Sequence, residues 1–404
     1  MRAAFVSPAW PAATYPNGIV SYIANLRPAL ADLDVQSVVA AGRVADDSQS
    51  DSVADVRDHL SRNVFERLFD RLSRDHHGVG EIRRARGIVR AIRALETASD
   101  ISARHIDVVE IEESFGLCRH VEAFGDWPTV VRLHGPWFLN GPALGVPRDA
   151  EFDRRVRDEG EALAHAHFVS APSLDVLERT RTFYDLSLED AVVIPNACPA
   201  VPVTSRWRQE NADPDRVLFV GRFDLHKGGD IVIDAIARVL RSRPNTRLWF
   251  AGPDKGIPNG DRGSLDAPSY LARAIPDPRL RERVELLGPC DSQHLDRMRR
   301  EAALTLVASR YENFPMTVLE ALAYGSPLVA TNVGGIAEIV RNGENGWLVP
   351  GDDLNALADG ILQGLSSADE AQRISVNAAE DTLKRYSPGK VATQTRSFYT
   401  HLLG

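Results

Sequence analysis

Residues 311–325 read Tyr-Glu-Asn-Phe-Pro-Met-Thr-Val-Leu-Glu-Ala-Leu-Ala-Tyr-Gly. This stretch predicts a loop followed by a short helix. Pro315 suits a first helical turn, residues 316–324 carry an apolar helical pattern, and Gly325 can end the helix in the left-handed conformation. The apolar run at 304–308 is typical of a buried strand. A strand, a loop and a helix in this order form the repeating unit of a parallel α/β sheet.

Two carboxylates frame this loop and helix. Glu312 falls in the loop and Glu320 falls about one turn inside the helix, with seven residues between them. The backbone N–H groups of the first turn have no partner within the helix, so they form an anion site. Carboxylates repel a phosphate and suit neutral hydroxyls. A nucleotide-sugar has a diphosphate in its middle and polyols at both ends, so it suits the anion site and both carboxylates.

The composition fits two α/β domains, because 404 residues are enough for each to have its own core. The net charge of −9, from 47 basic and 56 acidic side chains, argues against nucleic acid as the main partner. The three cysteines form no CxxC pair, which fits a reducing compartment and does not fit a zinc site. The N-terminal apolar run is too short for a signal peptide and no later run spans a membrane, so we expect a cytoplasmic protein.

Apolar strand-like runs alternate with helical patterns in both halves, which predicts an α/β chain with two doubly wound sheets. We expect a first domain at 1–198, a Pro-rich polar linker at 199–215 and a second domain at 216–387. A cleft is expected where the two halves meet. Strands are expected at 3–6, 35–40, 106–111, 129–133, 167–170, 191–194, 216–220, 247–251, 284–287, 304–308, 327–330 and 346–349. Helices of the second domain are expected at 230–241, 292–300, 316–324 and 336–341.

The carboxylate pair matches the Glu-x7-Glu signature of the retaining GT-B glycosyltransferases, and the chain resembles family 4 of that group, the glycosyl transferases group 1. The resemblance is close over residues 217–352 and consists of scattered short matches before them. It implies a GT-B architecture, in which two Rossmann-like domains face each other across the cleft. It also implies that the last helix, 388–404, crosses back onto the first domain. Other matching elements are Val220-Gly221-Arg222, Lys227-Gly228, Val333-Gly334-Gly335 with Glu338, Asn345 to Val349 and Ile194-Pro195-Asn196.

Arg222 and Lys227 lie in the loop between an apolar strand and a helix that Asp230 is expected to cap. Ligands of open α/β sheets bind beyond the carboxyl ends of the strands, where such a loop lies. Two cations there can stabilise the negative charge that develops on a departing nucleoside diphosphate. Lysine is rare in this chain, and such a bias towards arginine is typical of GC-rich bacterial genomes. Because lysine is rare, its presence in this loop favours a role in phosphate binding. The other reading is a pair of solvated surface cations.

The resemblance implies further donor contacts. Glu320 would accept hydrogen bonds from ribose hydroxyls, and Glu312 would sit near the hydroxyls of the donor sugar. Gly18 would approach the phosphates from the first domain, with a bare turn as the alternative, and Gly288 begins a segment that would hold the base through backbone groups. The base cannot be read, so UDP-, GDP- and ADP-sugars stay open. The loop and first helical turn that would meet the sugar and phosphates comprise Asn313, Phe314, Pro315, Met316 and Thr317.

His134 follows the apolar strand at 129–133, and similar enzymes place a histidine there beside the donor sugar. A neutral imidazole can bind a sugar hydroxyl or assist proton movement, and the alternative is a histidine that caps local backbone groups. Glu110, Glu112 and Trp137 are candidates to line the acceptor pocket, the carboxylates by binding hydroxyls and the ring by stacking on a sugar face. A core or rim role is an equal alternative for each.

No metal and no cofactor is expected. Asp32-Leu33-Asp34 precedes a strand and Asp213-Pro214-Asp215 lies in the expected linker, so neither has the position in which this pattern holds metal in another glycosyltransferase fold. The two cations of the 222–227 loop make a divalent ion unnecessary for the leaving group. The arginine-rich stretch 57–104 allows weak peripheral membrane contact, although its interspersed acids favour a solvated face.

The expected reaction is transfer of a sugar, with retention of configuration, from a nucleoside-diphosphate-sugar to a hydroxyl of a glycan, a lipid-linked saccharide or a small molecule. One alternative is a catalytically silent sugar-nucleotide-binding subunit. Such a subunit would not need all five of the cationic, acidic and histidine site residues named at the end of this paragraph. Another is a GT-B isomerase or a phosphorylase, and no lysine has a suitable context for pyridoxal phosphate. A nicotinamide dehydrogenase is disfavoured because no strand precedes G-x-G-x-x-G. The sugar, the acceptor and the oligomeric state stay open. The five residues are Arg222, Lys227, Glu312, Glu320 and His134.

Overall fold

The structure is a computed structural model that describes residues 1–404 except 16, 61–78, 99–104 and 261–262. The chain divides into two compact units. Unit 1 consists of Met1–Phe138, Arg148–Ala197 and Pro388–Gly404, and unit 2 consists of Leu139–Pro147 and Cys198–Ser387. Each unit has its own parallel sheet, as the alternating sequence pattern predicted.

Unit 1 is built on a seven-stranded parallel sheet with the order β3-β2-β1-β4-β5-β6-β7. The order reverses between β1 and β4, which is the switch point of a doubly wound fold. The strands are β1 Arg2–Ser7, β2 Gln36–Ala41, β3 Val53–Asp55, β4 Val108–Glu112, β5 Thr129–Arg132, β6 Phe168–Ala171 and β7 Val192–Val193.

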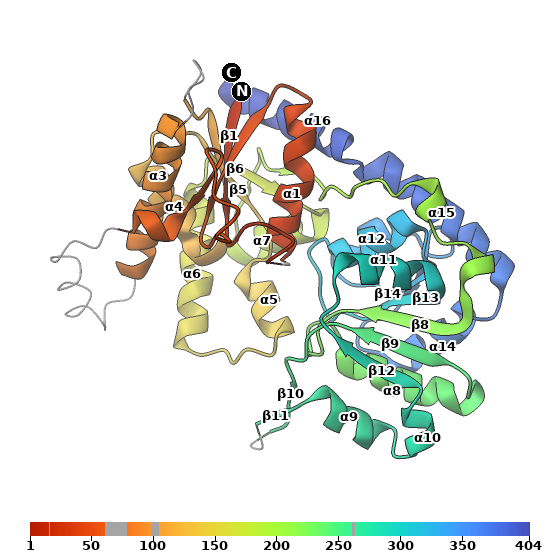
Figure 1. Cartoon of the computed structure of the whole chain (residues 1–404). Helices are drawn as coiled ribbons and strands as arrows, with labels where there is room; N and C mark the ends of the chain where they lie inside the picture. The colour runs from red at the N-terminus through yellow and green to blue at the C-terminus, as the bar shows by residue number, and fades with distance from the viewer. Residues whose placement is uncertain (16, 61–78, 99–104, 261–262) are drawn as a thin grey trace. The chain divides into compact units, whose positions relative to one another are not determined.

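Helices cover both faces of this sheet, and Figure 1 shows α1 and α16 on one side and α3 and α4 on the other. Asn17 begins α1 as its N-cap by accepting a hydrogen bond from the Ile19 amide. Val391, Phe398 and Tyr399 of α16 pack into the same core as α1. The helices of unit 1 are α1 Gly18–Ala31, α3 Val79–Ala98, α4 Leu117–Phe124, α6 Ala150–His165, α7 Leu174–Tyr184 and α16 Pro388–Leu403, and α5 Trp137–Ala143 leads into the first segment of unit 2.

Unit 2 is built on a six-stranded parallel sheet with the order β12-β9-β8-β13-β14-β15. Its strands lie within about three residues of the predicted bounds. The sequence pattern missed the small antiparallel hairpin of β10 Ile257–Pro258 and β11 Ser264–Leu265. The sheet strands are β8 Asp213–Val220, β9 Arg247–Ala251, β12 Val284–Gly288, β13 Ala302–Val307, β14 Leu328–Thr331 and β15 Trp347–Val349.

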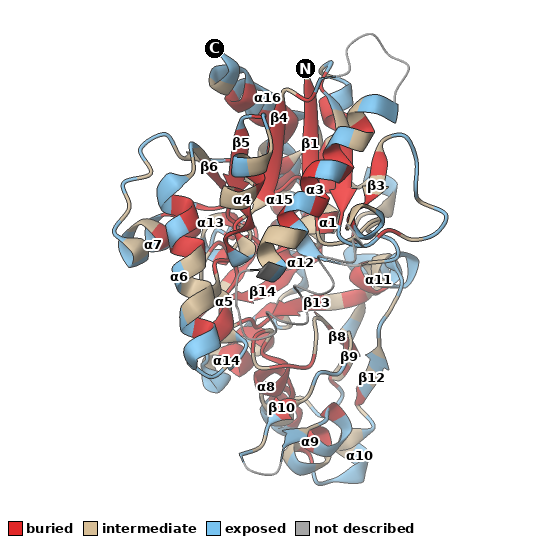
Figure 2. Ribbon diagram, turned by 90° about the vertical axis from the view of Figure 1, so that its left-hand side faces the viewer, coloured by how far each residue is buried: buried red, intermediate tan, exposed pale blue. Residues whose placement is uncertain are grey.

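The helices of unit 2 form two layers. Helices α8 and α14 pack together on one face of the sheet, and α12 and α15 pack together on the other. Figure 2 shows the strands buried along most of their length and the helices exposed on their outer faces. The helices are α8 Gly229–Ser242, α9 Ala267–Ala274, α10 Pro278–Arg281, α11 Ser292–Glu301, α12 Met316–Tyr324, α13 Ile336–Ile339, α14 Leu354–Gly364 and α15 Ala368–Tyr386.

The stretch expected as a linker packs against unit 2. Trp207 is buried, its indole Nε1 donates to the carbonyl of Ala302 at 2.8 Å, and its amide donates to the carbonyl of Tyr324 at 2.8 Å. Strand β8 already begins at Asp213, so the second Asp-x-Asp pattern lies in a strand. Asp213 pairs there with Arg247, which corrects the expected position of this pattern.

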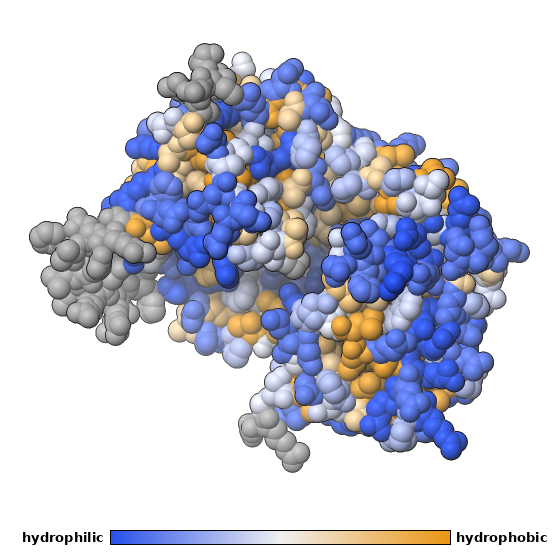
Figure 3. All heavy atoms as spheres, viewed as in Figure 1, coloured by the Kyte–Doolittle hydropathy of each residue, from blue (hydrophilic) through white to orange (hydrophobic). Residues whose placement is uncertain are grey.

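Figure 3 shows hydrophilic side chains over much of the face in view. Residues 61–78 and 99–104 of the arginine-rich stretch 57–104 lie outside the described residues. In the described part, Arg84, Arg86 and Arg93 of α3 lie over aromatic rings of unit 1. Within the described ranges, no helix combines the length and the apolar character that crossing a bilayer requires.

Candidate functional site

Arg222 lies in unit 2 just beyond the carboxyl end of β8, where the sequence placed it. Its Nε donates to Asp224 Oδ2 at 2.6 Å, and its side chain is 37% exposed. Together with Asp224, Leu225 and Lys255 it lines a groove of about 480 Å³ that the β10–β11 hairpin also borders. The guanidinium is therefore held in a recess instead of standing free in solvent.

Lys227 and Glu312 form an ion pair that the sequence did not predict. Lys227 Nζ lies 2.5 Å from Glu312 Oε1, and the Ser309 hydroxyl donates to the same oxygen at 2.7 Å. Burial alone would raise the pKa of Glu312, but the Lys227 charge and these hydrogen bonds hold the pKa below its usual value. Lys227, expected to bind the diphosphate, and Glu312, expected to bind the sugar, are therefore in direct contact.

His226 and Asp224 tie the two loops of this site together. His226 Nε2 lies 2.8 Å from the carbonyl of Tyr311, which precedes Glu312, and its Nδ1 lies 3.5 Å from Arg222 Nη2. Asp224 Oδ1 accepts the amide of Lys227 at 2.7 Å. Burial lowers the pKa of His226, so its ring is neutral at pH 7. Both residues position the cations, and neither was singled out in the sequence.

Asp230 does not cap α8, which corrects the sequence-based prediction. Helix α8 begins at Gly229, with Gly228 as its N-cap in the left-handed conformation. Asp230 lies in the first turn and accepts two hydrogen bonds from Arg310, at 2.9 and 2.8 Å. Arg310 also donates to Asp352 at 2.8 Å, so it joins the loops that follow β8, β13 and β15. One arginine among many gave no sequence signal for this role.

Helix α12 has the bounds that the sequence predicted. It runs from Met316 to Tyr324 and ends at Gly325, whose φ is 67°. Pro315 is its N-cap and not its first helical residue, and no side chain caps the N-terminus. The amides of Met316 and Thr317 therefore lack a side-chain cap within the described structure, as an anion site requires.

The residues just before α12 differ in what they can offer a ligand. Phe314 is buried and its ring meets Tyr386 edge-on at 5.5 Å, so only its backbone is available to a ligand. The side-chain nitrogen Nδ2 of Asn313 donates to Asn140 Oδ1 at 3.4 Å, and Asn140 belongs to the first segment of unit 2.

Glu320 lies on α12 and pairs with Arg299 of α11. Arg299 is buried, whereas the Glu320 side chain is 38% exposed. A buried guanidinium on one side orients the carboxylate and leaves its exposed side for a ligand. The base-binding candidate Gly288 lies at the carboxyl end of β12 with a φ of 67°, and Asp291 caps α11 three residues later.

In unit 1, His134 lies just beyond the carboxyl end of β5. Its amide donates to Glu113 Oε2 at 2.8 Å, and its ring meets Tyr22 edge-on with a centroid separation of 5.3 Å. Burial and the charge of Arg132 lower the pKa of His134 well below its usual value, so the imidazole is neutral at pH 7. A neutral ring fits a hydrogen-bonding role with a sugar hydroxyl.

Glu110 has the core position that the sequence left as an equal alternative to the acceptor side. It is buried in unit 1, and the Tyr399 hydroxyl of α16 donates to its Oε2 at 2.7 Å. Arg132 lies in the same core, where its guanidinium stands 4.1 Å over the Tyr22 ring and donates to Asn196 Oδ1 at 3.0 Å. Burial raises the pKa of Glu110, while the Arg132 charge opposes the rise.

The other two acceptor candidates lie closer to the surface. Glu112 accepts a hydrogen bond from the Ser114 hydroxyl at 3.2 Å, and burial raises its pKa. The Trp137 ring carries the guanidinium of Arg155 at 3.8 Å, so one face of the ring is occupied. Gly18 is the first residue of α1, and it is exposed with no atom within 4 Å of the position that a Cβ would take.

Glu113 should make stability depend on pH. Burial and the charge of Glu159 raise its pKa to about 8, although the His134 and Gly135 amides donate to it. The folded state keeps a proton that the unfolded state loses above the ordinary glutamate pKa, so stability falls as pH rises toward 8. Between pH 5 and pH 8, the stability of Glu113→Gln relative to the parent should increase by about 3–4 kcal/mol.

Urea unfolding of the two proteins at pH 5, 6.5 and 8 measures this change. Glu189→Gln, at an exposed position of unit 1, is the matched control and should show no such trend. A pH-independent difference between Glu113→Gln and the parent would show that Glu113 is ionised throughout.

Two family models match the chain. The model described as Glycosyltransferase Family 4 matches residues 16–200, and the model described as Glycosyl transferases group 1 matches residues 204–381. A D-inositol 3-phosphate glycosyltransferase of Frankia alni is 30% identical over 62% of this chain and 63% of its own length. An uncharacterized glycosyltransferase of Methanocaldococcus jannaschii is 31% identical over 46% of this chain and 45% of its own length. The matched region thus spans about half the length of these curated relatives.

Solved structures share the fold over nearly the whole chain. A sucrose-phosphate synthase from Thermosynechococcus elongatus has a TM-score of 0.72 and 20% identity, covering 99% of this chain and 98% of its own. Anabaena HepE in complex with UDP-glucose has a TM-score of 0.68 and 18% identity, covering 99% of this chain and 100% of its own. These structures confirm the GT-B fold, and the family models confirm the resemblance. The chain belongs to the family 4, or group 1, glycosyltransferases.

Proposed function

We propose that this protein transfers a sugar from a nucleoside-diphosphate-sugar to a hydroxyl acceptor, with retention of configuration at the anomeric carbon. The observation that carries the proposal is the meeting of Arg222, Lys227 and Glu312 at the carboxyl edge of the unit 2 sheet. Two cations and one carboxylate there provide partners for a diphosphate and for sugar hydroxyls. The Anabaena HepE structures, which hold UDP and UDP-glucose, support this class of donor.

The leaving group determines the role of the cations. Transfer breaks the bond between the anomeric carbon and a phosphate oxygen, and negative charge develops on that oxygen. Arg222 and Lys227 would stabilise this charge, with the uncapped α12 amides adding N–H donors. Because two fixed cations are available, we propose that the reaction needs no divalent metal. The acceptor hydroxyl would attack from the side that the leaving group departs, without a covalent enzyme intermediate.

The remaining roles follow from the chemistry of each side chain. Glu320, oriented by Arg299, would accept hydrogen bonds from ribose hydroxyls, and Glu312 would accept them from the sugar. The neutral ring of His134 would bind a sugar hydroxyl or help move the acceptor proton. Glu112 and Trp137 are the candidates for the acceptor side. We propose a hydroxyl of a glycan, a lipid-linked saccharide or a small molecule as the acceptor.

A thermal-shift panel with UDP, GDP and ADP tests donor binding. One diphosphate should stabilise the protein by about 2.7 kcal/mol when present at 100 times its dissociation constant. The same shift should be absent in Arg222→Ala. If none of the three diphosphates raises the melting temperature, the donor site is misassigned.

Product NMR with the donor that this panel selects tests the reaction. An α-linked donor should give an α-linked product, and a β-linked product would refute retention. Donor binding without any turnover over a panel of glycan acceptors would favour the silent-subunit alternative. Activity that EDTA abolishes and Mg²⁺ restores would refute metal independence.

A further inference from the structure

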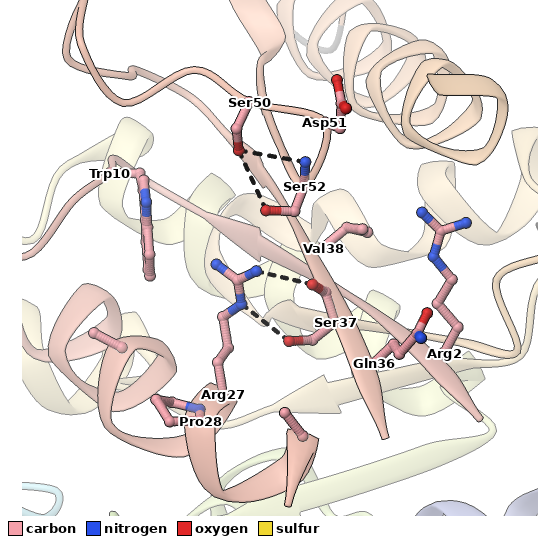
Figure 4. Close-up of a pocket in the computed structure, with 12 residues that line it drawn as sticks. Arg2, Trp10, Arg27, Pro28, Gln36, Ser37, Val38, Ser50, Asp51 and Ser52 are labelled. Carbon is pink, nitrogen blue, oxygen red and sulfur yellow. Dashed lines mark hydrogen bonds between the residues drawn. The ribbon is translucent and has the colours of Figure 1, made fainter. Parts of the chain in front are cut away.

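Unit 1 contains a groove that takes no part in the proposed donor site. It has a volume of about 890 Å³ and lies between α1, the first half of β2 and the loop before β3. Neither Gly18 nor His134 lines it. Figure 4 shows its lining. Its aromatic and polar lining side chains include Trp10, Arg27, Gln36, Ser50, Asp51 and Ser52.

Arg27 is the central polar group of the groove. Its side chain extends from α1 toward β2, where Nε donates to Ser37 Oγ at 3.0 Å and Nη2 donates to the Ser37 carbonyl at 2.8 Å (Figure 4). Among the described residues, no carboxylate lies within ion-pair distance of Arg27, and its two side-chain hydrogen bonds both go to Ser37. Burial lowers the pKa of Arg27, as expected for a charge without a counter-ion. Within the part of the chain that the structure describes, neither hydrogen bond uses Nη1, so its N–H groups can serve a ligand.

The walls of the groove are largely apolar. Trp10 stands beside Arg27, with the guanidinium 5.3 Å from the centre of the ring, and α1 contributes Ala24, Pro28 and Ala31. Flat apolar surfaces of this kind pack against the C–H faces of sugar rings. Small-molecule sites typically combine such walls with a few polar groups that fix orientation.

The rim supplies those polar groups. Ser50 and Ser52 lie above Arg27 in Figure 4, and their hydroxyls are 3.2 Å apart. Gln36 and Asp51 add an amide and a carboxylate, both on exposed residues. Short hydroxyls and planar amide and carboxylate groups match the paired donors and acceptors of vicinal sugar hydroxyls. Asp51 stands at the rim, whereas the uncompensated cation lies deeper, so the interior favours an anionic group.

We propose that this groove is a second saccharide-binding site that takes an acidic saccharide, with a carboxylate or phosphate on the Arg27 guanidinium and a sugar ring along the Trp10 wall. A charge-assisted pair with a guanidinium is stronger than a neutral hydrogen bond and has a defined geometry. The inference rests on the lining of the groove and does not depend on the proposed transfer reaction. Its test is therefore a binding measurement.

Calorimetric titration of the whole protein with digalacturonic acid tests the proposal, and cellobiose and inorganic phosphate are the comparison probes. Digalacturonic acid should bind at least about tenfold more tightly than either, because only it offers both the anion and the rings. Arg27→Gln should weaken this binding by at least about tenfold and leave UDP affinity unchanged. The separate UDP measurement distinguishes failure of this site from failure of the proposed donor site.

Two further variants make the test independent of folding. Arg93→Gln is the matched control, since Arg93 also lies over a tryptophan of unit 1 but is paired with Asp126, and it should bind digalacturonic acid like the parent. Ala24→Leu keeps Arg27 and fills the groove, and it should weaken binding as well. Undetectable binding to the parent, equal binding of phosphate alone, or unchanged binding in Arg27→Gln would each overturn the proposal.

Discussion

Lys227→Met should lower the rate of sugar transfer at saturating donor by about two to three orders of magnitude, the loss typical of removing one group that stabilises a developing oxyanion. Methionine keeps most of the length of the side chain and removes only the charge. In the structure the ammonium is fixed against Glu312 at 2.5 Å and is 24% exposed, so it is already positioned at the end of the site. Steady-state kinetics with the donor chosen by thermal shift measures the effect.

The control for this substitution concerns Glu312, which would lose its cation while buried. A buried carboxylate without a partner destabilises a fold or takes up a proton. The double variant Lys227→Met with Glu312→Gln removes both charges and should restore thermal stability without restoring transfer. Lys384→Met, at an exposed position on α15, is the matched lysine control and should transfer like the parent.

Two outcomes would count against the assignment. Transfer by Lys227→Met within a factor of two of the parent would show that the ammonium does not act on the leaving group. Recovery of transfer in the double variant would show that the single substitution acted only through the unpaired Glu312.

The sequence predicted best those elements whose ends are marked by local chemistry. Helix α12 was predicted with its observed bounds because Pro315 cannot continue a helix backwards and Gly325 can adopt positive φ. Strand β9 was predicted with its observed bounds from one apolar run. Strand β3 and the β10–β11 hairpin were missed because their strands have two or three residues and no longer apolar run around them, unlike the equally short β7 and β15.

The residue types at the donor site could be predicted, but their pairing could not. Lys227 and Glu312 are 85 residues apart in the chain, and the register of β8 with β13 brings them together. Arg299 gave no signal as the partner of Glu320, because arginine is the common cation of this chain and its helix shows an ordinary charged pattern.

Glu110 shows the limit of reading one strand in isolation. A carboxylate near the carboxyl end of a strand faces either a ligand or a covering helix, and the two cases look alike in sequence. The partner that decides the matter here is Tyr399, which is 289 residues away. Glu113, three residues further along the chain, holds the His134 loop by accepting hydrogen bonds from two backbone amides.

Gly228→Ala should destabilise unit 2 by about 4 kcal/mol or more, one of the largest effects that a single methyl group can have. Gly228 has a φ of 70°, which is unfavourable for alanine, and a Cβ at this position would lie 2.0 Å from the carbonyl oxygen of Ala308. That contact involves backbone, so no side-chain rotation relieves it. For a unit of this size the melting temperature should fall by about 8–16 °C.

Gly343→Ala separates the strain of the backbone from the clash. Gly343 has a φ of 75° but nothing within 4 Å of its Cβ position, so alanine there should cost only about 1–2 kcal/mol. The close approach of Gly228 to Ala308 also brings Lys227 next to Ser309 and Glu312, so Gly228→Ala should reduce transfer even below its melting temperature. Calorimetric melting of both variants measures the difference, and equal losses would show that the backbone moves away from Ala308 at little cost and that the Lys227 loop is not fixed by this contact.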